Sequence, residues 1–191
     1  PSAHYQGSAV EVGGKVLLFG GLSKAKSSTS VIWSFDPATG STTPVGNLSA
    51  TLHDAASGVI GTTSFVYGGT TPKQVIATAQ QYTVGDKTAV QAGLLPTPRS
   101  DAAAVSDRSA SAVYVVGGWD GTNPTNDVLT STDGVTFTTV ATLAEPVRFP
   151  SAVLLGTDLW VFGGEWNDVA STSIQRVDLA KREAKVVAQM S

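Results

Sequence analysis

Four short runs of apolar residues, each ending in a pair of glycines, dominate the hydrophobic pattern of the chain. The first glycines of successive pairs are 48, 49 and 46 residues apart. Chance rarely repeats a six-residue pattern at near-constant spacing, so the pattern indicates four repeats. Because the apolar residues do not alternate with polar ones, each run predicts a strand buried on both faces. The runs are Val16-Leu17-Leu18-Phe19-Gly20-Gly21, Ser64-Phe65-Val66-Tyr67-Gly68-Gly69, Val113-Tyr114-Val115-Val116-Gly117-Gly118 and Leu159-Trp160-Val161-Phe162-Gly163-Gly164.

The residues around each apolar run predict three more strands per repeat. Glycine, aspartate and threonine separate them, and these residues suit the positive φ angles of tight hairpin turns. Two hairpins per repeat make a four-stranded antiparallel sheet, which must stack on its neighbours to bury both faces. The expected first strands are residues 5–12, 53–59, 99–105 and 148–155; the third are 31–35, 79–82, 128–131 and 173–177; the fourth are 42–45, 89–92, 137–140 and 184–188.

These features resemble the kelch repeat. The double glycines are the specific part, and two links of the Leu-Pro-x-Pro-Arg type support them, Leu94-Leu95-Pro96-Thr97-Pro98-Arg99 and Leu143-Ala144-Glu145-Pro146-Val147-Arg148. The resemblance covers essentially the whole chain. It departs in the fourth strands, which lack the usual tryptophan, with Phe137 as the nearest substitute. The resemblance implies an all-β propeller in which each repeat is one blade and the first strands line a central channel.

The number of blades leaves three arrangements open. We expect one propeller domain or partial propeller over residues 1–191, with blades at approximately 1–47, 48–93, 94–142 and 143–191. Kelch propellers usually have six or seven blades, and an open arc of four would leave two apolar faces uncovered. The arc is therefore expected to belong to a larger ring, to pair with another copy, or to close as a small four-bladed ring.

Composition narrows the classes of partner. A net charge of −3 without a basic block argues against nucleic acid. No apolar run approaches the roughly 20 residues that cross a bilayer, so no membrane insertion is expected. The chain has no cysteine and two histidines, which excludes thiolate and three-histidine metal sites, and we expect no cofactor. The alanine- and threonine-rich, lysine-poor composition leans toward an extracytoplasmic location.

Candidate binding residues lie where the link enters a first strand and in the loop after a double glycine. Strands one and two run in opposite directions, so both sites are expected on one face. Repeats three and four are the richest there, with an aromatic residue and carboxylates beside an arginine, a set that suits a sugar or a peptide. The candidates are His53, Arg99, Trp119, Asp120, Arg148, Glu165, Trp166 and Asp168.

Several residues of this face also have a structural interpretation. Arg99 and Arg148 could hold the links by bonding to carbonyl groups, and Trp119 and Trp166 could cover the edges of their own blades. Asp54 and Asp101, at the channel mouth, could bond to backbone amides. The eight glycines are expected to be structural, because they permit close strand approach and positive φ: Gly20, Gly21, Gly68, Gly69, Gly117, Gly118, Gly163 and Gly164.

The favoured function at this level is a non-catalytic module that binds a protein or glycan, because no catalytic set is evident. One alternative is a sugar-modifying kelch enzyme of the mutarotase type, with Arg99, Glu165 and His53 serving acid–base chemistry. The other is a purely architectural module that dimerises through its open blade edges.

Overall fold

The computed structural model describes residues 5–191, which form strands, turns and loops without a helix. No segment within this range is a helix long and apolar enough to span a membrane. The strands make four antiparallel four-stranded sheets, each in sequential order, and one small hairpin. Blade 1 holds β1 (Ser8–Val12), β2 (Lys15–Phe19), β3 (Thr29–Asp36) and β4 (Ser41–Leu52); blade 2 holds β5 (Ala56–Ile60), β6 (Thr63–Tyr67), β7 (Thr78–Tyr82) and β8 (Val90–Leu94). Blade 3 holds β9 (Ala103–Asp107), β10 (Ala112–Val116), β11 (Asp127–Ser131) and β12 (Thr138–Thr142); blade 4 holds β13 (Ser151–Leu155), β14 (Asp158–Phe162), β17 (Ser173–Asp178) and β18 (Glu183–Gln189), with the hairpin β15 (Glu165–Trp166) and β16 (Val169–Ala170) inserted.

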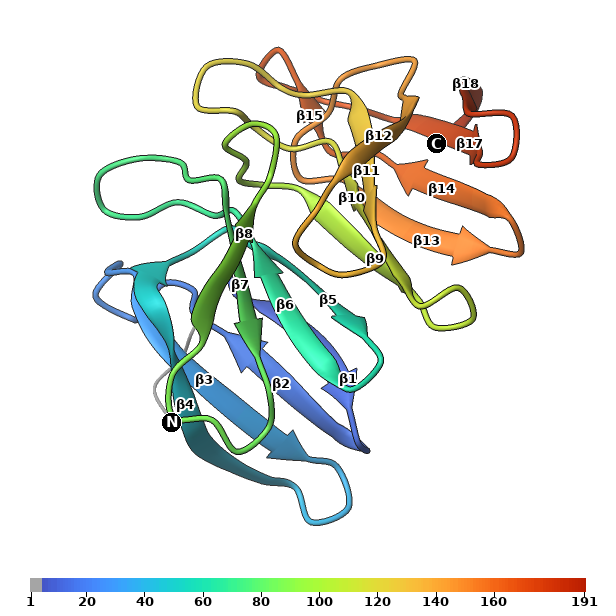
Figure 1. Ribbon diagram of the computed structural model, residues 1–191. Coiled ribbons are helices and arrows are strands. Elements are labelled where there is room, and N and C mark those ends of the chain that lie inside the picture. Colours follow the sequence, from blue (N-terminus) through green and yellow to red (C-terminus); the bar gives the residue numbers. More distant parts are fainter. Residues whose placement is uncertain (1–4) are drawn as a thin grey trace.

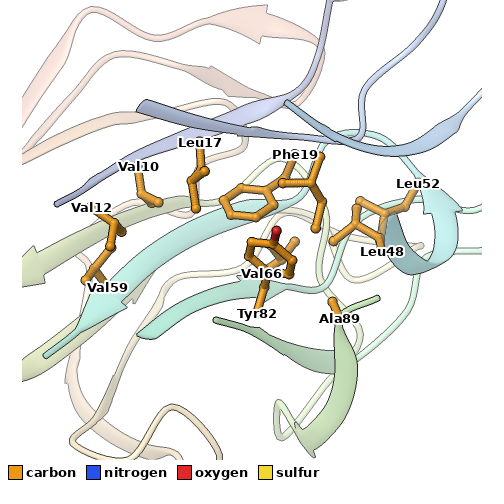
Figure 2. Packing of buried hydrophobic residues seen from close by; sticks show 11 residues of the cluster. Val10, Val12, Leu17, Phe19, Leu48, Leu52, Val59, Val66, Tyr82 and Ala89 are labelled. Atoms are coloured by element: carbon orange, nitrogen blue, oxygen red, sulfur yellow. The ribbon is translucent and has the colours of Figure 1, made fainter. Parts of the chain in front are cut away.

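The four blades follow one another as an arc, with blades 1 and 4 at opposite ends (Figure 1). This confirms the all-β fold of the kelch propeller type. The core consists of three clusters, and each cluster lies between two successive blades. In the first, Phe19 of blade 1 meets Tyr82 of blade 2 edge to face, with ring centroids 6.3 Å apart (Figure 2). Stacking of blades therefore buries the apolar residues, as expected of a sheet that cannot do so alone.

The second strands differ between middle and terminal blades. In β6 and β10 side chains on both faces are buried or nearly so, as predicted. In β2 and β14 buried positions alternate with exposed or half-buried ones. The prediction of two-sided burial is therefore wrong for the terminal blades, because each has only one neighbour.

The first strands begin about three residues later than predicted. A residue with positive φ separates each strand from the link before it, and such a residue interrupts the extended backbone. These residues are Gln6, Asp54, Asp101 and Phe149, with φ of 57°, 55°, 57° and 53°. The sequence does not predict this conformation, because phenylalanine and glutamine rarely have a positive φ and the hydrophobic periodicity carries no information about it.

The double glycines dock the link that leads into the following blade. In blade 2 the N–H of Gly69 donates to the carbonyl of Arg99 at 2.7 Å. Gly68 has φ +63°, and a Cβ added to it would lie 1.9 Å from the same carbonyl oxygen. Only glycine fits such an approach. Gly21 and Gly118 donate in the same way to the carbonyls of Leu52 and Val147.

Candidate functional site

The residues that enter the first strands pair with the residues that follow the double glycines. We call the surface that they form the loop face. Four isolated antiparallel bridges join the two sets of residues, at Tyr5–Leu22, His53–Thr70, Ser100–Trp119 and Arg148–Glu165. The expected juxtaposition of link and loop is thus present in every blade. The bridges also correct the predicted register, because Ser100 and not Arg99 is the counterpart of His53 and Arg148.

A chain of backbone hydrogen bonds connects the blades at the loop face. The N–H of Asp54 donates to the carbonyl of Gln6 at 2.9 Å, and the N–H of Asp101 donates to the carbonyl of Asp54 at 2.9 Å. The N–H of Phe149 then donates to the carbonyl of Asp101 at 2.7 Å. All four residues have positive φ, and within the series Asp54 and Asp101 each accept one bond and donate another, whereas Gln6 accepts and Phe149 donates. The side chains of Asp54 and Asp101 are consequently held close together near the axis of the arc.

Arg99 lies inside the protein. It occupies the position of Leu52 and Val147, which are core residues, and only 1% of its side chain is exposed. Its guanidinium donates to the carbonyl of Gly117 at 2.9 Å and forms an ion pair with Asp127 at 2.7 Å. Arg99 therefore fastens the link that leads into blade 3 to strand β11, in agreement with the interpretation that it holds the link. It is not accessible to a ligand on the loop face.

Arg148 is the centre of a polar and aromatic cluster. Its Nε and one terminal nitrogen donate to the same carboxylate oxygen of Asp101, at 3.0 and 2.7 Å. The guanidinium carbon lies 4.7 Å from the ring centroid of Trp119 and 4.8 Å from that of Phe149. Glu165 lies 3.6 Å away on the remaining side. These contacts fix the arginine in place and leave its positive charge largely matched.

Two carboxyl groups and a histidine share the mouth of the arc. Burial and the neighbouring Asp101 carboxylate raise the pKa of Asp54 to about 6, although Arg148 opposes the shift. Burial also raises the pKa of Asp101, against the hydrogen bonds and charge of Arg148. Burial lowers the pKa of His53, whose Nδ1 lies 2.9 Å from the hydroxyl of Ser28. Asp54 at the mouth therefore takes up a proton as the pH falls through about 6.

A hollow between the loops of blades 3 and 4 collects several of the candidate residues. We call it the blade 3–4 hollow. It encloses about 140 Å³ and has a mixed polar and aromatic lining. Four candidates meet there, Trp119, Arg148, Glu165 and Asp168. Their neighbours in the same loops, Thr122, Asn123, Pro124 and Asn167, complete the lining, although none of them was among the named candidates. The asparagines carry no signal in a single sequence, because only the loop conformation brings them to the hollow.

Trp119 also borders a wider groove between blades 2 and 3. Residues 70–75 and 119–122 line this groove, which holds about 530 Å³. Asp120 lies in its wall, and one of its oxygens accepts the N–H groups of Thr122 and Asn123, both at 2.7 Å. Asp120 therefore shapes the loop. The loop of blade 2, residues 70–75, forms half of this groove, although repeats three and four are the richest in candidate residues.

The last candidates are separated from the hollow or placed on its rim. Trp166 lies on the hairpin β15–β16 with 41% of its surface exposed. The turn of that hairpin is Asn167 and Asp168, both with positive φ. His53 lies in blade 2, beside Asp54, and is not among the residues that line the hollow. In the part of the chain that the structure describes, no three His, Asp or Glu residues are grouped to hold a metal ion.

Comparison with protein families identifies a Kelch motif at residues 3–49. This range covers blade 1, and the other three blades repeat its strand order and its double glycine. A search of curated proteins found no match.

Proposed function

We propose that this chain, a kelch-repeat β-propeller protein, is a non-catalytic binding module that recognises a protein through a basic side chain inserted in the blade 3–4 hollow. The observation that carries the proposal is the meeting of Trp119, Glu165 and Asp168 around one hollow. An aromatic ring and carboxylates together attract a guanidinium or ammonium group.

The charge balance of the hollow favours a cationic ligand over an anionic one. The only basic residue in its lining, Arg148, is already paired with Asp101 and approached by Glu165. Asp168 is exposed and adds a second negative charge at the rim. A ligand carboxylate would meet these groups, whereas a lysine or arginine side chain would complement them.

The size of the hollow favours a protein ligand over a large glycan. A volume of about 140 Å³ accommodates one extended side chain. The wider groove on the other side of Trp119 provides room for the neighbouring residues of the same peptide. The mutarotase-type alternative loses support, because one member of its acid–base set, Arg99, is buried.

The test uses four immobilised pools of random peptides whose central residue is fixed as Arg, Lys, Gln or Asp. We expect the fluorescently labelled chain to be retained by the Arg and Lys pools in preference to the Gln and Asp pools. Since a cation–π contact contributes about 0.5–2 kcal/mol, Trp119→Ala should weaken retention by roughly 2- to 30-fold. Asp168→Asn should weaken it in the same direction.

The control variant is Glu183→Gln, which removes one exposed carboxylate from β18, outside the hollow. It should bind as the unmodified chain does. Retention that is equal for all four pools, or that survives Trp119→Ala in a folded protein, would refute the proposed binding of a basic side chain.

A further inference from the structure

The interfaces between successive blades use equivalent second-strand positions three times, packed against residues of the preceding blade. On one side of each interface are residues of the first strand, such as Val10 and Val12 of β1, which are each 8% exposed against blade 2. On the other side is the second strand of the following blade, with the residue at the third position of its apolar run. At this position Val66, Val115 and Val161 are at most 1% exposed. Matched positions can therefore report whether a blade has a neighbour on either side.

Within residues 5–191, blade 1 packs against another blade on one side, and its other side, where the arc begins, is uncovered. Leu18 is the counterpart of Val66, Val115 and Val161, yet it is 40% exposed. Around it lies a groove of about 350 Å³, whose lining is mainly apolar and includes Phe19 and Trp33. We call this surface the entry face.

In the same described range, blade 4 packs on blade 3, and its opposite side is uncovered. The pairing registers make Val153 and Leu155 the counterparts of Val10 and Val12. They are 49% and 69% exposed, compared with 8% for each counterpart. We call this surface the exit face. In each interior interface an exit-type surface is covered by an entry-type surface, so the two open faces are the two halves of one interface.

The backbone hydrogen bonds between blades also run in one direction along the arc. In the chain of bonds at the loop face, each blade donates an N–H to the carbonyl of the blade before it. The N–H of Gln6 lies at the start of this chain and the carbonyl of Phe149 lies at its end. A blade 1 placed after blade 4 would continue the series, with Gln6 donating to Phe149.

We propose that two copies of this chain associate head to tail, with the exit face of each copy against the entry face of the other, to form a two-fold ring of eight blades. The occupant is a second copy because it carries both required surfaces, each already shaped for the other by the interfaces within the chain. In an assembly of two copies, each entry face meets an exit face and no open face is left. No smaller assembly of separate copies achieves this. The two ends of one copy differ, so the contact is heterologous and either closes or propagates.

The test is the mass of the chain in solution, measured by light scattering and sedimentation over a range of concentrations. We expect a species of twice the 19.5 kDa of one chain that does not grow on concentration. A folded monomer would overturn the proposal. So would a series of ever longer assemblies, because it would show that the contact does not close.

Two charge substitutions test the direction of the contact. Leu18→Asp alters the entry face and Val153→Asp alters the exit face, and both residues are already exposed in one copy, so the fold of the arc should survive. Each variant alone should be monomeric. Val90→Asp is the matched control, because Val90 is 60% exposed on the outer strand β8 and lies on neither face; it should leave the two-copy species intact.

A mixture of the two variants gives the decisive result. Combining the Leu18→Asp chain with the Val153→Asp chain leaves one unmodified exit face opposite one unmodified entry face. We therefore expect a two-copy species to reappear in the mixture, with weaker affinity than in the unmodified protein. If Val153→Asp alone remained dimeric, or if the mixture stayed monomeric while both variants kept a native circular dichroism spectrum, head-to-tail pairing would be wrong.

Discussion

Removing the buried arginine at residue 99 should destabilise the protein while leaving the loop face unchanged. The guanidinium of Arg99 is 1% exposed and contacts Gly117, Thr125, Thr97 and Asp127. Arg99→Met keeps much of the apolar stem and deletes these bonds. Loss of one partner of a buried ion pair costs about 3–5 kcal/mol. Because 27% of the Asp127 side chain reaches solvent, we expect the lower end of that range.

Removing the charge of the other partner, Asp127, should lower the free energy of unfolding by at least as much. Asp127→Asn leaves the Arg99 charge inside the protein with only neutral partners. In the double variant both charges are absent, so its cost should be smaller than the sum of the two single costs by about 1–3 kcal/mol. Urea unfolding, followed by tryptophan fluorescence at one fixed protein concentration, measures all three values.

Two outcomes would refute this reasoning. A change of less than about 0.5 kcal/mol for Arg99→Met is typical of surface positions and would contradict the structural role. Additive costs in the double variant would show that Arg99 and Asp127 do not interact. If Arg99→Met left stability intact but abolished peptide binding, the ligand-binding interpretation of this residue would be correct instead.

Two further predictions concern Asp54 and the double glycines. The folded state holds the proton of Asp54 more tightly than the unfolded chain, with a pKa of about 6 against 3.8, so the contribution of this group to stability falls as pH rises between those values. The slope is at most about 1.4 kcal/mol per pH unit, and urea titrations should show that Asp54→Asn removes it and is the more stable form at pH 7. Gly68→Ala should destabilise by clearly more than Gly61→Ala, because both glycines have positive φ, but an added Cβ meets Arg99 at 1.9 Å in the first case and no atom within 4 Å in the second. Equal losses of about 1–2 kcal/mol in urea unfolding would mean that backbone conformation alone explains the glycine.

Most of the fold could be predicted from the sequence, because it depends on a pattern that is repeated four times. The apolar runs, the turns between them and their spacing predicted every four-stranded sheet. The predicted strand boundaries and register were wrong where the backbone adopts a local conformation that the sequence does not indicate. Positive φ at Gln6 and Phe149 shortens the first strands, and the longer turn between β9 and β10 helped to place Arg99 at the wrong register.

The candidate site was predictable in outline. Adjacent strands run antiparallel, so the sequence could locate link and loop on one face, and Trp119, Arg148, Glu165 and Asp168 indeed line one hollow. It could not distinguish Arg99 from Arg148. Both follow similar links, but one position points into the core and the other lies at the mouth, between two aromatic rings.

By itself the sequence determined the repeat, the all-β class and the position of the polar loops, since these follow from hydrophobic periodicity and turn chemistry along the chain. Only the tertiary structure decided which polar residues are buried, which carboxyl groups have a raised pKa and which blade faces remain open. Those properties depend on distances between side chains from different repeats. Leu18 and Val66 occupy the same place in their repeats, and the presence of a neighbouring blade alone makes one exposed and the other buried.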